Sequence, residues 1–226
     1  MIDLEDLRSE AWYGVPMADP QIRVIVWKLL LGYLSPNQEL WASSESRKRE
    51  DYEEWSRTHF PNLTYSEDIN ESNLISEEMS EYEEKNYKQI IIDVKRTYPG
   101  EAFSSKIAKD MLTRMLFVWA FKHPASGYVQ GINDLASTFM YVFLAEAIDK
   151  NKREQGIRES EDDFEYNAYD IKLEDMVLLK EDQILNIEAD TFGWLENFLE
   201  TLQENYTDKQ PGVQKIVTKV EQIIHK

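Results

Sequence analysis

The chain has 226 residues, of which 42% are hydrophobic and 12% aromatic, and it contains no cysteine. This composition is typical of a globular protein with a substantial core, and it excludes disulfides, thiolate metal sites and cysteine nucleophiles. The net charge of -18 argues against nucleic acid or an anionic membrane surface as the direct ligand, because both attract basic footprints. A protein partner is the better expectation.

The three histidines, His59, His123 and His225, are widely separated, so the sequence predicts no metal site and no histidine-based catalytic site. No apolar run is long enough to span a bilayer, and the N-terminus is acidic where a signal peptide would be basic. We therefore expect a cytoplasmic protein without direct membrane insertion.

Apolar residues recur at helical spacing and Gly and Pro are few, which predicts an all-α, multi-helix fold with no significant β-sheet. The first long helix is expected to begin at Asp19-Pro20, an N-cap followed by proline at the first helical position. Its apolar residues from Ile22 to Leu31 are predicted to face the core. Residues 40–59 are expected to form a charged surface helix held by a few aromatic side chains.

A later helix carries Tyr87, Ile90, Ile91 and Val94 on one face and is expected to end before Pro99-Gly100. After an N-cap at Ser105, residues 107–121 are apolar on nearly all sides, which predicts a central, buried helix. A second apolar helix is predicted over residues 135–148.

Residues 149–182 are rich in acidic side chains and are predicted to be a linker or a disordered excursion. We assign residues 1–182 to one subdomain, with this linker at its end, and residues 183–226 to the start of a second. The last helix has an apolar stripe that reaches the final residues. Either the chain stops inside a larger domain or a terminal helix docks on its neighbour.

The stretch from Gly127 to Leu135 departs from ordinary helical sequence, because Gly127 and Gly131 flank an aromatic ring and an amide at Tyr128 and Gln130. Glycines permit unusual backbone dihedrals, and an amide both donates and accepts hydrogen bonds, so the loop is suited to present a functional group. The alternative is a plain interhelical turn with Asn133 or Asp134 as the N-cap of the next helix.

A second informative stretch runs from Ile90 to Pro99, where Asp93 and Arg96 lie three residues apart at a helix end. At this spacing the carboxylate can accept from the guanidinium and hold it in one orientation. The alternative is an ordinary surface ion pair worth at most about 1 kcal/mol.

Three motifs follow one another along the chain: Arg23, Trp27 and Gly32; then Ile90, Asp93 and Arg96; then Tyr128, Gln130 and Gly131 followed by Asn133-Asp134-Leu135. In order and spacing they resemble the motifs of the TBC-domain family of Rab GTPase-activating proteins, from about Trp12 to the end. Residues 123–127 and 187–192 are similar to the branch of that family associated with the Golgi. The resemblance covers the N-terminal part of such a domain.

The resemblance implies that Arg96 is an arginine finger and Gln130 a glutamine finger, both supplied in trans to a Rab-type GTPase. The chemistry fits, since a guanidinium stabilises charge between the β- and γ-phosphates and an amide can align the attacking water. No cofactor of its own is implied, because GTP and magnesium belong to the partner. The residues implied in partner binding or support are Ile90, Asp93, Tyr128, Gly131, Asn133 and Asp134.

Two other functions stay open at this point. One is a non-catalytic helical module that binds a GTPase or another membrane-traffic protein, supported by the acidic surface and the abrupt end of the last helix. The other is a metal- or carboxylate-dependent hydrolase, supported only by the abundance of Asp and Glu. The family resemblance favours regulation of vesicle traffic by a cytoplasmic protein at the periphery of Golgi or other endomembranes.

Overall fold

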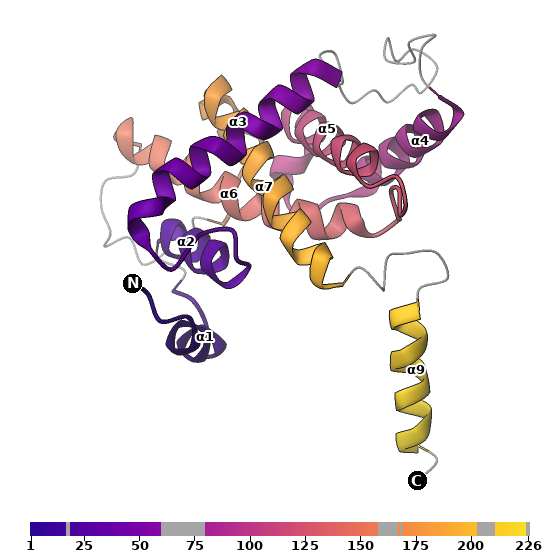
Figure 1. Ribbon diagram of the computed structural model, residues 1–226. Coiled ribbons are helices and arrows are strands. Elements are labelled where there is room, and N and C mark those ends of the chain that lie inside the picture. The colour runs from indigo at the N-terminus through magenta and orange to yellow at the C-terminus, as the bar shows by residue number, and fades with distance from the viewer. Residues whose placement is uncertain (17–18, 60–79, 158–166, 168, 203–210, 225–226) are drawn as a thin grey trace.

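A computed structural model describes residues 1–16, 19–59, 80–157, 167, 169–202 and 211–224 of the chain. Within these ranges every regular element is a helix, which confirms the predicted all-α fold without a sheet (Figure 1). The elements, in order, are α1 (Leu4–Trp12), α2 (Pro20–Leu30), η1 (Gln38–Leu40), α3 (Trp41–His59), α4 (Glu81–Arg96), η2 (Glu101–Ser104), α5 (Lys106–Lys122), α6 (Ile132–Glu154), η3 (Leu173–Leu178), α7 (Glu181–Thr201) and α9 (Pro211–Ile224).

Helix α5 is the centre of the fold, with α4, α6 and α7 packed around it (Figure 1). Its N-cap is Ser105, whose hydroxyl accepts from the Ala108 backbone, and its C-cap is His123. Apolar side chains on nearly all sides of a helix require neighbours on all sides, which explains this position. The fully buried residues along it include Met111, Leu112, Met115 and Leu116. The prediction of a central helix is confirmed.

Helix α4 is fixed at both ends by local chemistry. Ser80 and Glu83 form a capping box at its start, and the helix stops at Arg96, three residues before Pro99. One face carries the buried Tyr87, Ile90, Ile91 and Val94, as predicted. The same packing places Ile90 wholly inside the core, so it can support the predicted site only by holding α4 in place.

Helix α7 contributes two buried carboxylates that the sequence did not suggest. Asp190 accepts from Lys28 Nζ at 2.7 Å and from Arg49 Nε at 2.9 Å, and the Tyr33 hydroxyl donates to it at 2.8 Å. Burial raises the pKa of Asp190, but the Arg49 and Lys28 cations outweigh it and leave the pKa below its usual value. Asp190 therefore joins α2, α3 and α7 while remaining charged.

The second carboxylate on α7 is Glu188, which is fully buried between α3 and α5. Arg114 Nε donates to it at 2.9 Å and the Tyr52 hydroxyl at 3.2 Å. Burial raises the pKa of Glu188 to about 6, against the opposing effect of the Arg114 guanidinium. The two carboxylates occupy the stretch 187–192 that resembles the Golgi branch, where they tie α7 into the core.

Two expectations need correction, and a third stays a prediction. The predicted linker does not begin at residue 149, because α6 continues to Glu154, and part of its second half is the short helix η3 with Met176 buried. Ile22 is 41% exposed and not a core residue, since it lies at the edge of the apolar stripe of α2. Helix α7 shares its core with α3, α5 and α6, while the subdomain division at residue 182 stays a prediction. The acidic run 159–165 lies outside the described residues.

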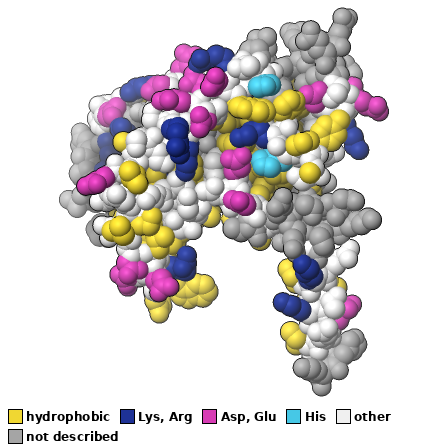
Figure 2. All heavy atoms as spheres, in the orientation of Figure 1, with side chains coloured by type: hydrophobic (Ala, Val, Ile, Leu, Met, Phe, Trp, Pro, Cys, Tyr) yellow, Lys and Arg dark blue, Asp and Glu magenta, His cyan; other side chains and the backbone are white. Residues whose placement is uncertain are grey.

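Helix α9 stands apart from the other helices in Figure 1, and Figure 2 shows hydrophobic side chains on its surface. Its apolar stripe, which the sequence predicted, is exposed to solvent in this structure. An apolar stripe of this kind usually packs against another apolar surface. The exposed residues are Val213, Ile216, Val217, Val220, Ile223 and Ile224.

Candidate functional site

Arg96 lies in the last turn of α4 and is held by Asp93, one turn earlier. A terminal guanidinium nitrogen of Arg96 forms an ion pair with Asp93 Oδ1 at 2.6 Å. The Asp93 side chain is fully buried, whereas the Arg96 side chain is 52% exposed. The predicted pairing is therefore confirmed, and it is no ordinary surface ion pair, because its anion is anchored inside the protein while its cation extends into solvent.

The same carboxylate is also bound by the loop after α5. The Tyr128 hydroxyl lies 2.8 Å from Asp93 Oδ2, and Gln89 donates its side-chain amide to Oδ1 at 3.0 Å. Burial raises the pKa of Tyr128 well above its ordinary value, and the hydrogen bond to Asp93 adds to this effect. The phenol thus stays protonated as a donor, and Asp93 connects Arg96 on α4 with the loop that carries Gln130.

Asn133 completes this network from the first turn of α6. Its amide nitrogen donates to Thr97 Oγ1 at 2.8 Å, and its carbonyl oxygen accepts from the Gly131 backbone at 3.0 Å. Thr97 Oγ1 in turn donates to the Asp93 carbonyl at 2.7 Å. Asn133 is buried, and its hydrogen bonds fix both the segment after Arg96 and the turn after Gln130.

The two predicted glycines have different structural roles. Gly131 is the N-cap of α6 in the left-handed region, at φ 101°, which a side chain would strain. Gly127 also has positive φ, and a Cβ there would lie 2.5 Å from the Tyr82 hydroxyl oxygen. The alternative of Asn133 or Asp134 as the N-cap is wrong, since α6 already begins at Ile132 and its cap is Gly131.

The remaining predicted residues are exposed around this buried network. Gln130 and Asp134 are exposed, and Asp134 accepts the second amide hydrogen bond of Asn133 at 3.0 Å. The structure thus brings Arg96, Asp93, Tyr128, Asn133 and Asp134 into one connected set, with Gln130 on the loop that the set holds. The arrangement presents an always charged guanidinium and an amide from two segments fixed to a single carboxylate.

Sequence reasoning missed three residues of the network: Asn86, Gln89 and Thr97. Asn86 accepts from the Tyr128 backbone at 3.0 Å through its side-chain oxygen and so fixes the start of the loop. Gln89 and Thr97 lie four residues before and after Asp93, a spacing that places side chains on one face of a helix. That spacing could have identified Gln89 and Thr97 from the sequence, whereas no sequence pattern pointed to Asn86.

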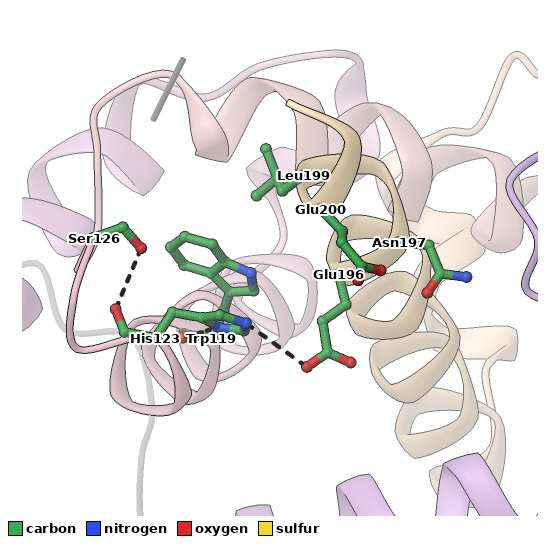
Figure 3. Close-up of a pocket in the computed structure, with 7 residues that line it drawn as sticks. All are labelled: Trp119, His123, Ser126, Glu196, Asn197, Leu199 and Glu200. Carbon is green, nitrogen blue, oxygen red and sulfur yellow. Dashed lines mark hydrogen bonds and ion pairs between the residues drawn. The ribbon is translucent and has the colours of Figure 1, made fainter. Parts of the chain in front are cut away.

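The cavity in Figure 3 is not the predicted site, although it adjoins the same loop. It has a volume of about 330 Å³ and lies between the end of α5, the segment up to Ser126 and the C-terminal part of α7. Its described lining residues, which include neither Arg96 nor Gln130, are Trp119, His123, Ser126, Glu196, Asn197, Leu199 and Glu200.

The described residues contain no group of three or more His, Cys, Asp or Glu side chains placed to hold a metal ion. Among the described helices, none is both long enough and apolar enough to cross a membrane.

Comparison with known families supports the resemblance noted in the sequence. The family model of the Rab-GTPase-TBC domain matches residues 20–226. The chain belongs to the Rab-GTPase-TBC domain family. The matched range includes the three ordered motifs around Arg23, Asp93 and Tyr128, while the roles of their individual residues stay predictions.

Two curated relatives match nearly all of the TBC chain. TBC1 domain family member 22B of Homo sapiens is 35% identical over 223 residues, covering 98% of this chain and 37% of the relative. The GTPase-activating protein gyp1 of Schizosaccharomyces pombe is 35% identical over 225 residues, covering 99% of this chain and 37% of the relative. The chain thus spans little more than a third of the length of these relatives.

A solved structure has the same fold. The crystal structure of the Ypt/Rab-GAP domain of Gyp1p superposes with a TM-score of 0.76 at 31% sequence identity, over 99% of this chain and 60% of that one. The all-helical TBC fold predicted from the sequence is therefore shown.

Proposed function

We propose that this chain is a GTPase-activating protein for a Rab-type small GTPase, with Arg96 and Gln130 as fingers supplied in trans. The observation that carries the proposal is the buried Asp93 carboxylate, which binds both Arg96 and Tyr128. Asp93 thereby holds both the exposed guanidinium of Arg96 and the loop that carries the exposed amide of Gln130. The proposal is also supported by the names of two similar proteins, the GTPase-activating protein gyp1 and the Ypt/Rab-GAP domain of Gyp1p.

In the proposed mechanism the guanidinium of Arg96 enters the GTPase site and neutralises charge that develops between the β- and γ-phosphates. Its pairing with Asp93 restricts the side chain before the partner arrives, so less entropy is lost on engagement. The Gln130 amide accepts from the attacking water and donates to a phosphate oxygen, which aligns the water with the γ-phosphorus. GTP and magnesium arrive with the GTPase, and the chain supplies no cofactor.

The buried residues have supporting roles in this proposal. Tyr128 and Asn133 set the path of the loop through their hydrogen bonds with Asp93 and Thr97. Gly131 allows the turn after Gln130, and the exposed Asp134 faces the partner. Ile90 holds α4 from within the core. In this proposal Arg96 and Gln130 contact the GTPase site, and the buried residues hold them in position.

The test is single-turnover GTP hydrolysis by a panel of Rab proteins. The full chain should accelerate at least one of them, and Arg96→Ala should reduce the acceleration by about 10³- to 10⁵-fold. Gln130→Ala should reduce it by about 10²-fold, because the water loses its alignment. Matched controls are Arg57→Ala, which removes an exposed ion-paired arginine of α3, and Gln21→Ala on α2.

Two results would refute the catalytic assignment: no Rab protein is accelerated by the full chain, or Arg96→Ala accelerates as well as the wild type. If a Rab protein binds equally well to the variant that lacks both fingers while its hydrolysis rate never changes, the chain is the non-catalytic binding module instead. We also propose that the chain acts in the cytoplasm at the periphery of Golgi or other endomembranes, which microscopy of the tagged chain against Golgi markers tests.

A further inference from the structure

We infer that a groove beside Arg96 binds an apolar segment of the partner GTPase that carries a carboxylate side chain. This inference rests on the proposed function for its choice of partner. The groove has a volume of about 400 Å³, and we call it the flank groove. Its described lining residues are Arg23, Trp27, Pro99, Thr138, Tyr141, Val142 and Tyr169.

The flank groove is continuous with the segments that carry both fingers. Pro99 follows Arg96 by three residues, and Thr138 lies on α6, the helix that starts directly after the Gln130 loop. The two walls touch, since a Cβ on Gly100 would lie only 2.8 Å from Tyr141 Cε2. The flank groove is thus lined by the segment that follows Arg96 and by the helix that follows Gln130.

In the sequence, an exposed aromatic residue separates Arg96 from the groove wall. Tyr98 is 62% exposed and directly precedes Pro99 in the groove wall. Tyrosine combines a large apolar area with a polar tip, and it is enriched at the cores of protein interfaces. Together with the apolar lining of Trp27 and Val142, it offers a partner area to cover next to the charged finger.

The positive charge of Arg23 in the groove favours a bound segment with a negative charge. Arg23 is the one charged residue among its described lining residues. A terminal guanidinium nitrogen donates to the Val15 carbonyl at 3.2 Å, and the guanidinium carbon lies 5.1 Å from the centre of the Tyr169 ring. Arg23 Nε and the Tyr169 hydroxyl are both buried, and the Arg23 cation lowers the pKa of Tyr169 against the larger raising effect of burial.

The printed hydrogen bond of the Arg23 guanidinium goes to a neutral carbonyl, so a charged acceptor that enters the groove would gain a charge-assisted hydrogen bond from this cation. A carboxylate next to an apolar side chain has that chemistry, because the apolar part covers Trp27 and Val142 while the oxygen reaches Arg23. The first motif of the sequence, which contains Arg23 and Trp27, thereby gains a role in partner recognition.

The test measures affinity without chemistry. Each Rab protein of the panel, loaded with a non-hydrolysable GTP analogue, is titrated with the Arg96→Ala, Gln130→Ala double variant, with and without a groove substitution. Arg23→Gln removes the charge, and Thr138→Trp fills the groove from an exposed position that leaves the core intact. Each should raise the Kd of the Rab protein bound by the double variant about tenfold. Arg8→Gln on α1 is the matched control and should not change the Kd.

The same groove substitutions with both fingers intact should leave the maximal hydrolysis rate at saturating chain unchanged. An unchanged Kd overturns the inference, as does a lower maximal rate at constant Kd, which would mean that the groove only positions Arg96. Groove-dependent self-association of the chain, seen by sedimentation without any effect on the Rab protein, would also overturn it.

The two proposals fail separately. If the chain accelerates a Rab protein but the groove substitutions do not change binding, the flank-groove inference is refuted and the proposed activity stands. If the groove substitutions weaken binding but no acceleration occurs, the proposed activity is refuted and the flank-groove inference stands. If no Rab protein binds the chain at all, both are wrong.

Discussion

Two aspartates, Asp93 and Asp190, are both buried and both paired with basic residues, yet they are built differently. Asp190 binds Lys28, whose side chain is only 5% exposed, together with Arg49 and the Tyr33 hydroxyl. Asp93 binds Arg96, whose side chain is 52% exposed, and otherwise the neutral donors Tyr128 and Gln89. One carboxylate keeps a cation inside the fold, while the other holds its cation at the surface.

The difference separates an enclosed ion pair from one whose cation is accessible. Removing one partner of an enclosed pair leaves an uncompensated buried charge, which is costly. Around Asp93, neutral donors satisfy the carboxylate from inside, so the guanidinium of Arg96 remains available to a second molecule. We therefore expect substitutions at Asp190 to change mainly stability and substitutions at Asp93 to change mainly rate.

The largest expected effect is on stability. Asp190→Ala should lower the free energy of unfolding by about 3–5 kcal/mol, because Lys28 and Arg49 lose their buried anion and Lys28 keeps only the partly exposed Glu45. Denaturant unfolding followed by circular dichroism measures it. Glu53→Ala, which breaks the exposed Glu53–Arg57 pair on α3, is the control and should cost at most about 1 kcal/mol. A loss from Asp190→Ala no larger than the control would show that the buried cluster does not stabilise the fold.

A smaller effect is expected on the rate. Asp93→Asn keeps the shape of the side chain but removes the charge that holds Arg96, so single-turnover hydrolysis of the activated Rab protein should slow about 10- to 100-fold. The control is Glu84→Gln, which removes the acidic partner of Lys88 on the same helix. If Asp93→Asn leaves the rate unchanged, Asp93 does not position Arg96 and the contrast with Asp190 is lost.

The smallest effect concerns Glu188 and pH. Its folded pKa of about 6 lies above the ordinary value of 4.5, so between these values the folded state binds more protons than the unfolded state. The contribution of Glu188 to stability is therefore present below pH 4.5 and is lost as the pH rises through 6, by up to about 2 kcal/mol.

Unfolding at several pH values measures this contribution as the difference between wild type and Glu188→Gln. The difference should shift in favour of the wild type as the pH falls from 7 to below 5. A difference that is flat over this range would mean that Arg114 holds Glu188 at its ordinary pKa and that burial does not dominate.

Much of the candidate site could be predicted from the sequence because its contacts join residues that are close along the chain. Asp93 and Arg96 are three residues apart, so their pairing follows from helix geometry once α4 is recognised. The caps at Asp19 and Ser105 were also predicted, because a capping side chain bonds to backbone only two or three residues away. Asn133 was predicted near the site, but its hydrogen bonds to Thr97 and the Gly131 backbone were not.

The sequence by itself determined the long apolar helices, the caps at Asp19 and Ser105 and the local pairing of Arg96, since each depends on residues within about one turn. Only the tertiary structure decided that Tyr128 binds Asp93 across 35 residues and that Lys28 binds Asp190 across 162. Those contacts depend on which helix faces meet, and α5 sets that arrangement because it must be covered on all sides. The same packing places the Gln130 loop on the carboxylate that holds Arg96.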